Sequence, residues 1–263
     1  MIRHTFSFLQ GIGDVSEQRL WREGIRCWDD FLNTPSLSWI APAQKRLYDE
    51  TLQAAALHLA AHDADFFRHL LKPRDHWRLF PEMREYAVAL DIETNGAGVR
   101  QGGYVTVVGL YDGFDYQALV RGSTLSARRL AQELKGYSYV ITFFGTVFDL
   151  PFLRESLGVS YTGLHFDLCF AARRVGMKGG LKTLERRFGM VREEAVQGLD
   201  GFDAVLLWRA AQQGDDEALR LLVAYNRCDT VSLFQLAEVL YEQLRQRTGF
   251  DRLAGARMPV AVS

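Results

Sequence analysis

The feature that most constrains the fold of this chain is a change in its residue pattern near residue 80. Before that point the sequence is typical of helices, and residues 44–71 contain no Pro or Gly. After it come four runs rich in β-branched and aromatic residues, at 86–94, 104–112, 116–120 and 137–145. A helical pattern separates the last two runs, and helical patterns dominate the rest of the chain. This alternation predicts an α/β sheet with helices packed on its faces.

The same change divides the chain into parts. Its 263 residues fit one large domain with an appendage. We expect a helical N-terminal region over 1–80, an α/β domain over 81–250 and a C-terminal tail over 251–263. The segment around Pro73 and Pro81 is the predicted connector.

Composition narrows the class of protein. Hydrophobic residues make up 48% of the chain and charged residues 24%, as in a soluble globular protein. No apolar run approaches the roughly 18 residues that a membrane span requires, and the N-terminal residues lack the apolar segment of a signal peptide. The three cysteines form no CxxC pair, so we expect reduced thiols and a cytoplasmic location.

The balance of charge excludes a globally basic nucleic-acid-binding protein, because 31 basic and 32 acidic residues give a net charge of −1. Net charge does not exclude a local basic patch. Residues 171–192 contain seven Lys or Arg and a single Glu. This stretch is either a solvated helical face or such a patch.

Acidic residues occur at three places in the sequence whose positions favour a catalytic role. Asp91 and Glu93 end the apolar run YAVAL, and residues i and i+2 of a strand project to the same face. Asp149 follows another apolar strand and a glycine turn, at the predicted start of a helix. Tyr225 and Asp229 stand four residues apart in the last helix and share one of its faces. Taken singly, these are also explained as a strand end, a helix cap and an interfacial tyrosine beside a surface acid.

Convergence of these segments would place four carboxylates in a small volume. Their repulsion would raise their pKa values unless cations joined them. Carboxylates are the ligands that Mg²⁺ and Mn²⁺ prefer, and two such ions about 3.5–4 Å apart promote phosphodiester cleavage. The pattern predicts a site for two Mg²⁺ or Mn²⁺ ions, in which Tyr225 orients the attacking water.

The three segments resemble, in order, the motifs of the DEDD exonuclease superfamily: DIET at 91–94, FFGTVFDLPFL at 143–153 and YNRCD at 225–229. A tyrosine four residues before the last aspartate is typical of its DEDDy branch. The segments HFDL at 165–168 and GGLKTLERRFGM at 179–190 make the chain similar to the bacterial YprB-like predicted ribonuclease H-like exonucleases.

The resemblance covers about residues 84–245 and implies a ribonuclease H-like fold, with a mixed five-stranded sheet flanked by helices. It implies a hydrolase that removes nucleotides from the 3′ end of single-stranded nucleic acid with two metal ions. In that scheme Asp91 bridges both ions, while Glu93 and Asp229 hold the ion that activates water. Asp149 supports the second ion, and Tyr225 positions the nucleophile.

The chain departs from this family at Phe144, where members often carry Asn before the glycine. The departure keeps a second interpretation open, a catalytically weak or inactive nucleic-acid-binding module of the same fold. A structure-selective endonuclease is the third, because one fold supports several activities.

The N-terminal region contains an element similar to a helix-hairpin-helix. The turn Gly11-Ile12-Gly13 precedes a predicted helix, a second glycine turn and another helix. Backbone N–H groups of such a turn bind phosphate without reading bases. The presence of this hairpin-like element favours DNA slightly over RNA as the substrate. The alternative is an ordinary helical hairpin. Further candidate nucleic-acid-binding residues are Thr94, Lys182 and Phe148, the last by stacking on a terminal base.

Overall fold

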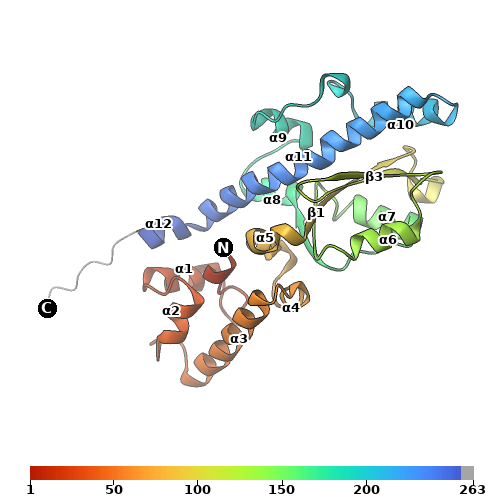
Figure 1. The fold of residues 1–263 in the computed structure, drawn as a ribbon. Coiled ribbons are helices and arrows are strands. Elements are labelled where there is room, and N and C mark those ends of the chain that lie inside the picture. The colour runs from red at the N-terminus through yellow and green to blue at the C-terminus, as the bar shows by residue number, and fades with distance from the viewer. Residues whose placement is uncertain (256–263) are drawn as a thin grey trace. The chain divides into compact units, whose positions relative to one another are not determined.

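The computed structural model describes residues 1–255, which form two compact units (Figure 1). The first unit comprises residues 1–83 and the described residues from Tyr241 on. The second comprises Arg84–Leu240.

The first unit is helical. Its elements are η1 (Ile2–His4), α1 (Asp14–Arg22), α2 (Trp28–Asn33), α3 (Pro42–Ala60), α4 (Ala64–Leu70), η2 (Pro73–Leu79), α5 (Phe80–Met83), the end of α11 (Asp216–Thr248) and α12 (Phe250–Gly255). Trp21, Trp28 and Phe31 are almost fully buried in its core. The predicted tail over 251–263 begins within α12, and its residues 256–263 lie outside the described residues.

The predicted helical stretch 44–71 contains two helices, α3 and α4. The break between α3 and α4 lies at His62, whose backbone has φ 52°. Asp63 then caps the N-terminus of α4, where its side chain accepts a hydrogen bond from the N–H of Phe66 at 3.2 Å. The helical stretch is therefore interrupted at a capping Asp, although it contains no Gly or Pro.

The second unit is built on a five-stranded sheet in the order β3-β2-β1-β4-β5. The strands are β1 (Ala87–Thr94), β2 (Val105–Tyr111), β3 (Tyr116–Val120), β4 (Tyr139–Thr142) and β5 (Leu164–Asp167). β1 pairs antiparallel with β2 and parallel with β4, so the sheet is mixed and β1 is central. The helical elements of this unit are η3 (Arg84–Tyr86), η4 (Val99–Gln101), α6 (Ala127–Leu134), α7 (Asp149–Leu157), α8 (Leu168–Arg174), α9 (Leu181–Arg187), η5 (Glu194–Val196), α10 (Gly201–Gln212) and α11 up to Leu240.

Helices cover both faces of this sheet. Val88, Leu90 and Ile92 of β1 pack in one apolar core with residues of α6 and α7. The opposite face packs against α10 and α11, and this core includes Val107 and Tyr225. Figure 1 shows α11 crossing the sheet on the side away from α6 and α7. Because side chains alternate along a strand, Asp91 and Glu93 belong to the face that α11 covers. The predicted α/β architecture is confirmed.

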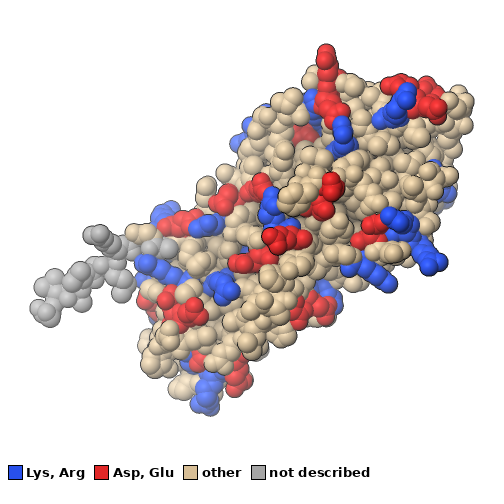
Figure 2. Space-filling model, in the orientation of Figure 1, with Lys and Arg blue, Asp and Glu red and all other residues tan. Residues whose placement is uncertain are grey.

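The charged residues do not form one basic surface in the view of Figure 2, where Lys and Arg alternate with Asp and Glu across the described part of the chain. This agrees with the net charge of −1. Among the described residues, no helix has the length and apolar character that spanning a membrane requires.

Candidate metal centre

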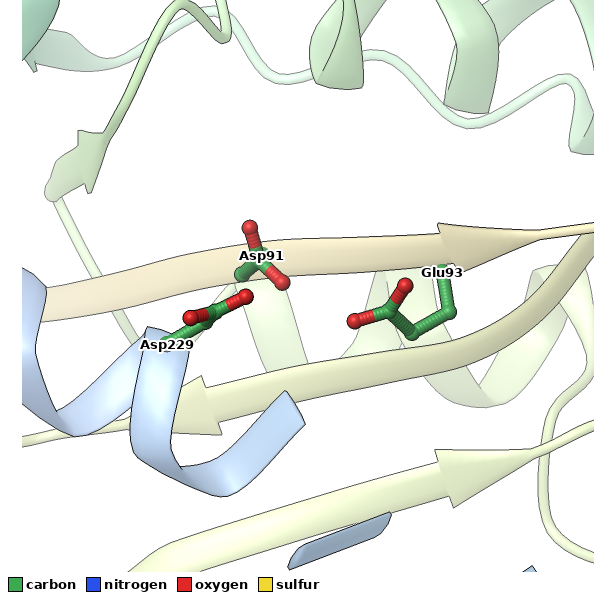
Figure 3. A group of neighbouring side chains, drawn as sticks. All are labelled: Asp91, Glu93 and Asp229. Atoms are coloured by element: carbon green, nitrogen blue, oxygen red, sulfur yellow. The ribbon is translucent and has the colours of Figure 1, made fainter. Parts of the chain in front are cut away.

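Three of the predicted acids meet where α11 passes over β1. Asp91 and Glu93 come from β1 and Asp229 from α11, and one carboxylate oxygen of each lies within 4.8 Å of the others. Figure 3 shows Glu93 and Asp229 directed toward Asp91. A donor set of carboxylate oxygens fits Mg²⁺ or Mn²⁺, which prefer hard oxygen ligands.

A buried amide holds two of these acids in place. The Nδ2 group of Asn226 donates to Asp91 at 2.8 Å and to Glu93 at 3.4 Å. Its Oδ1 accepts from the hydroxyl of Tyr116 at 2.9 Å, which fixes which side of the amide faces the acids. Asn226 is fully buried, and a buried hydrogen-bond network stabilises the fold only when each of its polar groups has a partner.

A glycine in β2 lets α11 approach this closely. A Cβ atom at Gly109 would lie 2.1 Å from Oδ1 of Asn226 and 2.3 Å from Oγ1 of Thr230. Gly109 pairs with Asp91 across the two strands, so it lies directly beside the acids.

We expect Gly109→Ala to destabilise the protein by about 1–3 kcal/mol, because the added methyl group must push α11 off the sheet. Urea unfolding measures this effect. Gly201→Ala is the matched control, since a Cβ at Gly201 meets nothing within 4 Å. Equal stability of the two variants would show that α11 does not need this close approach.

Asp149, the fourth predicted acid, is near this group but not part of it. It begins α7, and its carboxylate accepts a hydrogen bond from the N–H of Ile92 at 3.2 Å. Ile92 lies between Asp91 and Glu93 in β1, and the charge of Asp149 contributes to raising the pKa of Asp91. The structure therefore brings three of the four acids within 4.8 Å and places the fourth against the same strand.

Burial and mutual repulsion disfavour the ionised forms of these acids. Burial, then the charges of Glu93 and Asp229, raise the pKa of Asp91 well above its usual range. Burial and the charge of Asp229 raise the pKa of Glu93 to about 8. Burial raises the pKa of Asp149 to about 7. A cluster of this kind gains stability from a cation.

Two basic side chains of the stretch 171–192 reach the site. Nζ of Lys182 donates to the hydroxyl of Tyr225 at 2.9 Å and also to the carbonyl of Leu199. Arg192 forms an ion pair with Asp229 and another with Glu185. The stretch is therefore not only a solvated helical face.

The loop before Asp149 is held by a different acid. Asp167 accepts hydrogen bonds from the N–H groups of Phe144 and Thr146, both at 2.9 Å. Phe144 has φ 68°, in the left-handed region that Asn adopts more readily than Phe. Its ring lies 6.1 Å from that of Phe170, and the guanidinium of Arg173 lies 5.4 Å from the Phe170 ring. The partly buried Phe144 and the exposed Phe170 and Arg173 thus form an aromatic and cationic patch at this loop.

Comparison with protein families assigns the chain to a superfamily. The family model for the RNase H superfamily matches residues 88–241, more than half of the chain. The chain belongs to the ribonuclease H superfamily. Among solved structures, Brucella melitensis NrnC is similar, with a TM-score of 0.47 and 21% sequence identity, over 66% of this chain and 81% of that one. A comparison with curated proteins finds no match.

The other residues predicted to bind nucleic acid lie in both units. In the second unit, Thr94 follows a bulge in β1 and accepts from the N–H of Gly96 at 3.3 Å. Phe148 is 43% exposed and directly precedes Asp149. The turn Gly11-Ile12-Gly13 belongs to the first unit, where Gly13 caps α1 and Ile12 is buried. Phosphate binding there stays a prediction.

Sequence reasoning missed Asn226, Glu185 and Arg192. Asn226 carried a usable signal, because it lies three and four residues before Asp229 and Thr230 and so shares a polar face of the last helix with them. Glu185 and Arg192 carried none, since only the folded chain brings them to Asp229.

Proposed function

We propose that this protein is a metal-dependent nuclease of the DEDDy type that removes nucleotides from the 3′ ends of single-stranded nucleic acid. The observation that carries the proposal is the convergence of Asp91, Glu93 and Asp229 within 4.8 Å, with Tyr225 one helical turn before Asp229. Membership in the ribonuclease H superfamily supports the nuclease part of the proposal. In this proposal residues 81–250 are the catalytic domain and residues 1–80 an accessory helical region.

The acids would share the work of binding the ions. Asp91, Glu93 and Asp229 would hold Mg²⁺ or Mn²⁺, and Asp149, which contacts the backbone of β1 between Asp91 and Glu93, would support a second ion. When bound, two such ions activate a water molecule and stabilise the leaving oxygen in phosphodiester cleavage. Asn226 keeps Asp91 and Glu93 oriented for this role.

Tyr225 would orient the attacking water. Burial and the charges of Asp229 and Glu93 raise the pKa of Tyr225, so its hydroxyl stays protonated at neutral pH. That hydroxyl accepts a hydrogen bond from Lys182, which leaves its own proton free to direct toward a water or phosphate oxygen. Tyr225 thus acts as a positioned neutral donor rather than as a base.

The exposed rings of Phe148 and Phe170, with the partly buried ring of Phe144, would hold the end of the strand. Phe148 lies next to Asp149, while Phe144 and Phe170 follow the ends of β4 and β5. Thr142 of β4 pairs with Asp167 of β5, so both ends lie at one edge of the sheet. Bases stack on such rings without regard to sequence.

We expect Phe148→Ala to raise KM for a single-stranded oligonucleotide about tenfold with a smaller change in kcat, because one stacked base loses its partner. Steady-state kinetics measures both constants. Phe202→Ala removes a ring that is 65% exposed at the start of α10 and serves as the control. The same change in both variants would argue against a stacking role.

A degradation time course tests the function. The substrates are single-stranded DNA and RNA labelled at the 5′ end, incubated with Mg²⁺, with Mn²⁺ or with EDTA. Metal-dependent shortening from the 3′ end is the expected result, and the faster substrate identifies the preferred nucleic acid. Discrete internal cuts would support the endonuclease instead. Binding without cleavage would support the non-catalytic module.

A further inference from the structure

Arg192 contacts a predicted metal ligand directly. It lies in the loop between α9 and η5 and donates to Asp229 through Nη2. Nη2 and Nε also donate to the two oxygens of Glu185, each at 2.8 Å. Glu185 is in turn held by the hydroxyl of Ser232 at 2.5 Å. One guanidinium therefore joins Asp229 to a firmly anchored acid.

This contact and a metal ion at Asp229 oppose each other. An oxygen lone pair that accepts from a guanidinium is not free to ligate an ion. In addition, two cations beside one partly buried carboxylate repel each other strongly, because little water screens them. Glu185 offers Arg192 a second acid, so the guanidinium has a partner after it leaves Asp229.

The segment that carries Arg192 has room to move. Residues 190–192 border two cavities, of about 500 Å³ and about 480 Å³. Val191 is 90% exposed, and Gly189 and Gly198 on either side both have positive φ. Nη1 of Arg192 is buried without a hydrogen-bond partner among the described residues, so the contact is not fully satisfied as it stands.

We infer that Arg192 is an exchangeable counter-ion of the metal centre. Arg192 neutralises Asp229 when no metal is bound and competes with the divalent ion for that carboxylate. When the ion binds, Arg192 releases Asp229. The inference rests on the metal site of the proposed function. It adds a residue that sets the metal affinity and shields the acid cluster between binding events.

Calorimetric titration with Mn²⁺, together with thermal unfolding in EDTA, tests the inference. Arg192→Gln is expected to bind Mn²⁺ about tenfold more tightly than the wild type and to melt at a lower temperature in EDTA. Arg192→Lys keeps a charge without the two-pronged contact, so we expect an intermediate affinity. Arg220→Gln removes the same charge from an exposed pair on α11 and should match the wild type.

The outcomes distinguish a failure of the Arg192 inference from a failure of the metal site itself. If the wild type binds Mn²⁺ and Arg192→Gln binds it no more tightly, the competition is wrong and the metal site stands. If neither protein binds Mn²⁺, both are wrong. Should Arg192→Gln fail to fold, the affinity of Arg192→Lys relative to the wild type decides, and an unchanged affinity overturns the inference.

Discussion

Asp91→Asn is expected to lower the rate of nucleotide release on the order of a thousandfold, because it removes a charged ligand from the metal centre. The substitution keeps the shape of the side chain and an oxygen that accepts from Asn226. Burial and neighbouring charges raise the pKa of Asp91, so loss of this acid should not lower the melting temperature in EDTA. Single-turnover cleavage assays and thermal melts measure the two effects.

The matched control for this variant is Asp216→Asn, which neutralises an exposed acid at the start of the same helix that carries Asp229. It should cleave as the wild type does. Cleavage by Asp91→Asn at more than a tenth of the wild-type rate would contradict the assignment of the metal centre.

Without metal, the protein is expected to lose stability as the pH rises from about 5 to about 8. Glu93 has its pKa raised from 4.5 to about 8 and Asp149 from 3.8 to about 7. The folded chain therefore binds more protons than the unfolded chain in this window, and the free energy of unfolding falls with increasing pH. The contribution is fully present below the unfolded values and lost as the pH passes the folded ones.

Thermal melts between pH 5 and pH 9 in EDTA measure this slope, which should amount to several degrees. Millimolar Mn²⁺ should restore stability most at pH 8, where the acids are ionised and free to bind it. Glu93→Gln should flatten the slope in EDTA. A melting temperature that stays constant from pH 5 to pH 8 would mean that folding does not raise the pKa values of these acids.

The residue pattern was enough to predict β1, β2 and β4, because these strands are largely buried and stand out from the helices, whereas the five-stranded mixed sheet was implied by the resemblance to a known family. It could not predict the break at His62, which depends on an Asp cap and a positive φ at a residue that rarely adopts one. Spacing placed Asp91 beside Glu93, and Tyr225 beside Asp229. Bringing the two pairs together required the resemblance to a known family.

The parts of the site that escaped prediction come from contacts between distant segments. Glu185 and Arg192 lie in a stretch whose composition suits a solvated surface, and the fold turns them inward to Asp229. Gly109 is one of 23 glycines in the chain, and only the approach of Asn226 distinguishes it. The local residue pattern does not show which distant residues contact each other in the folded chain.

The most direct test of the metal centre is a crystal structure of the protein grown with Mn²⁺ and measured near the manganese absorption edge. We expect an anomalous peak about 2.1 Å from carboxylate oxygens of Asp91 and Asp229, with Glu93 beside it and Arg192 moved off Asp229. Absence of any peak among these three acids, with Arg192 still bound to Asp229 at saturating Mn²⁺, would contradict the account.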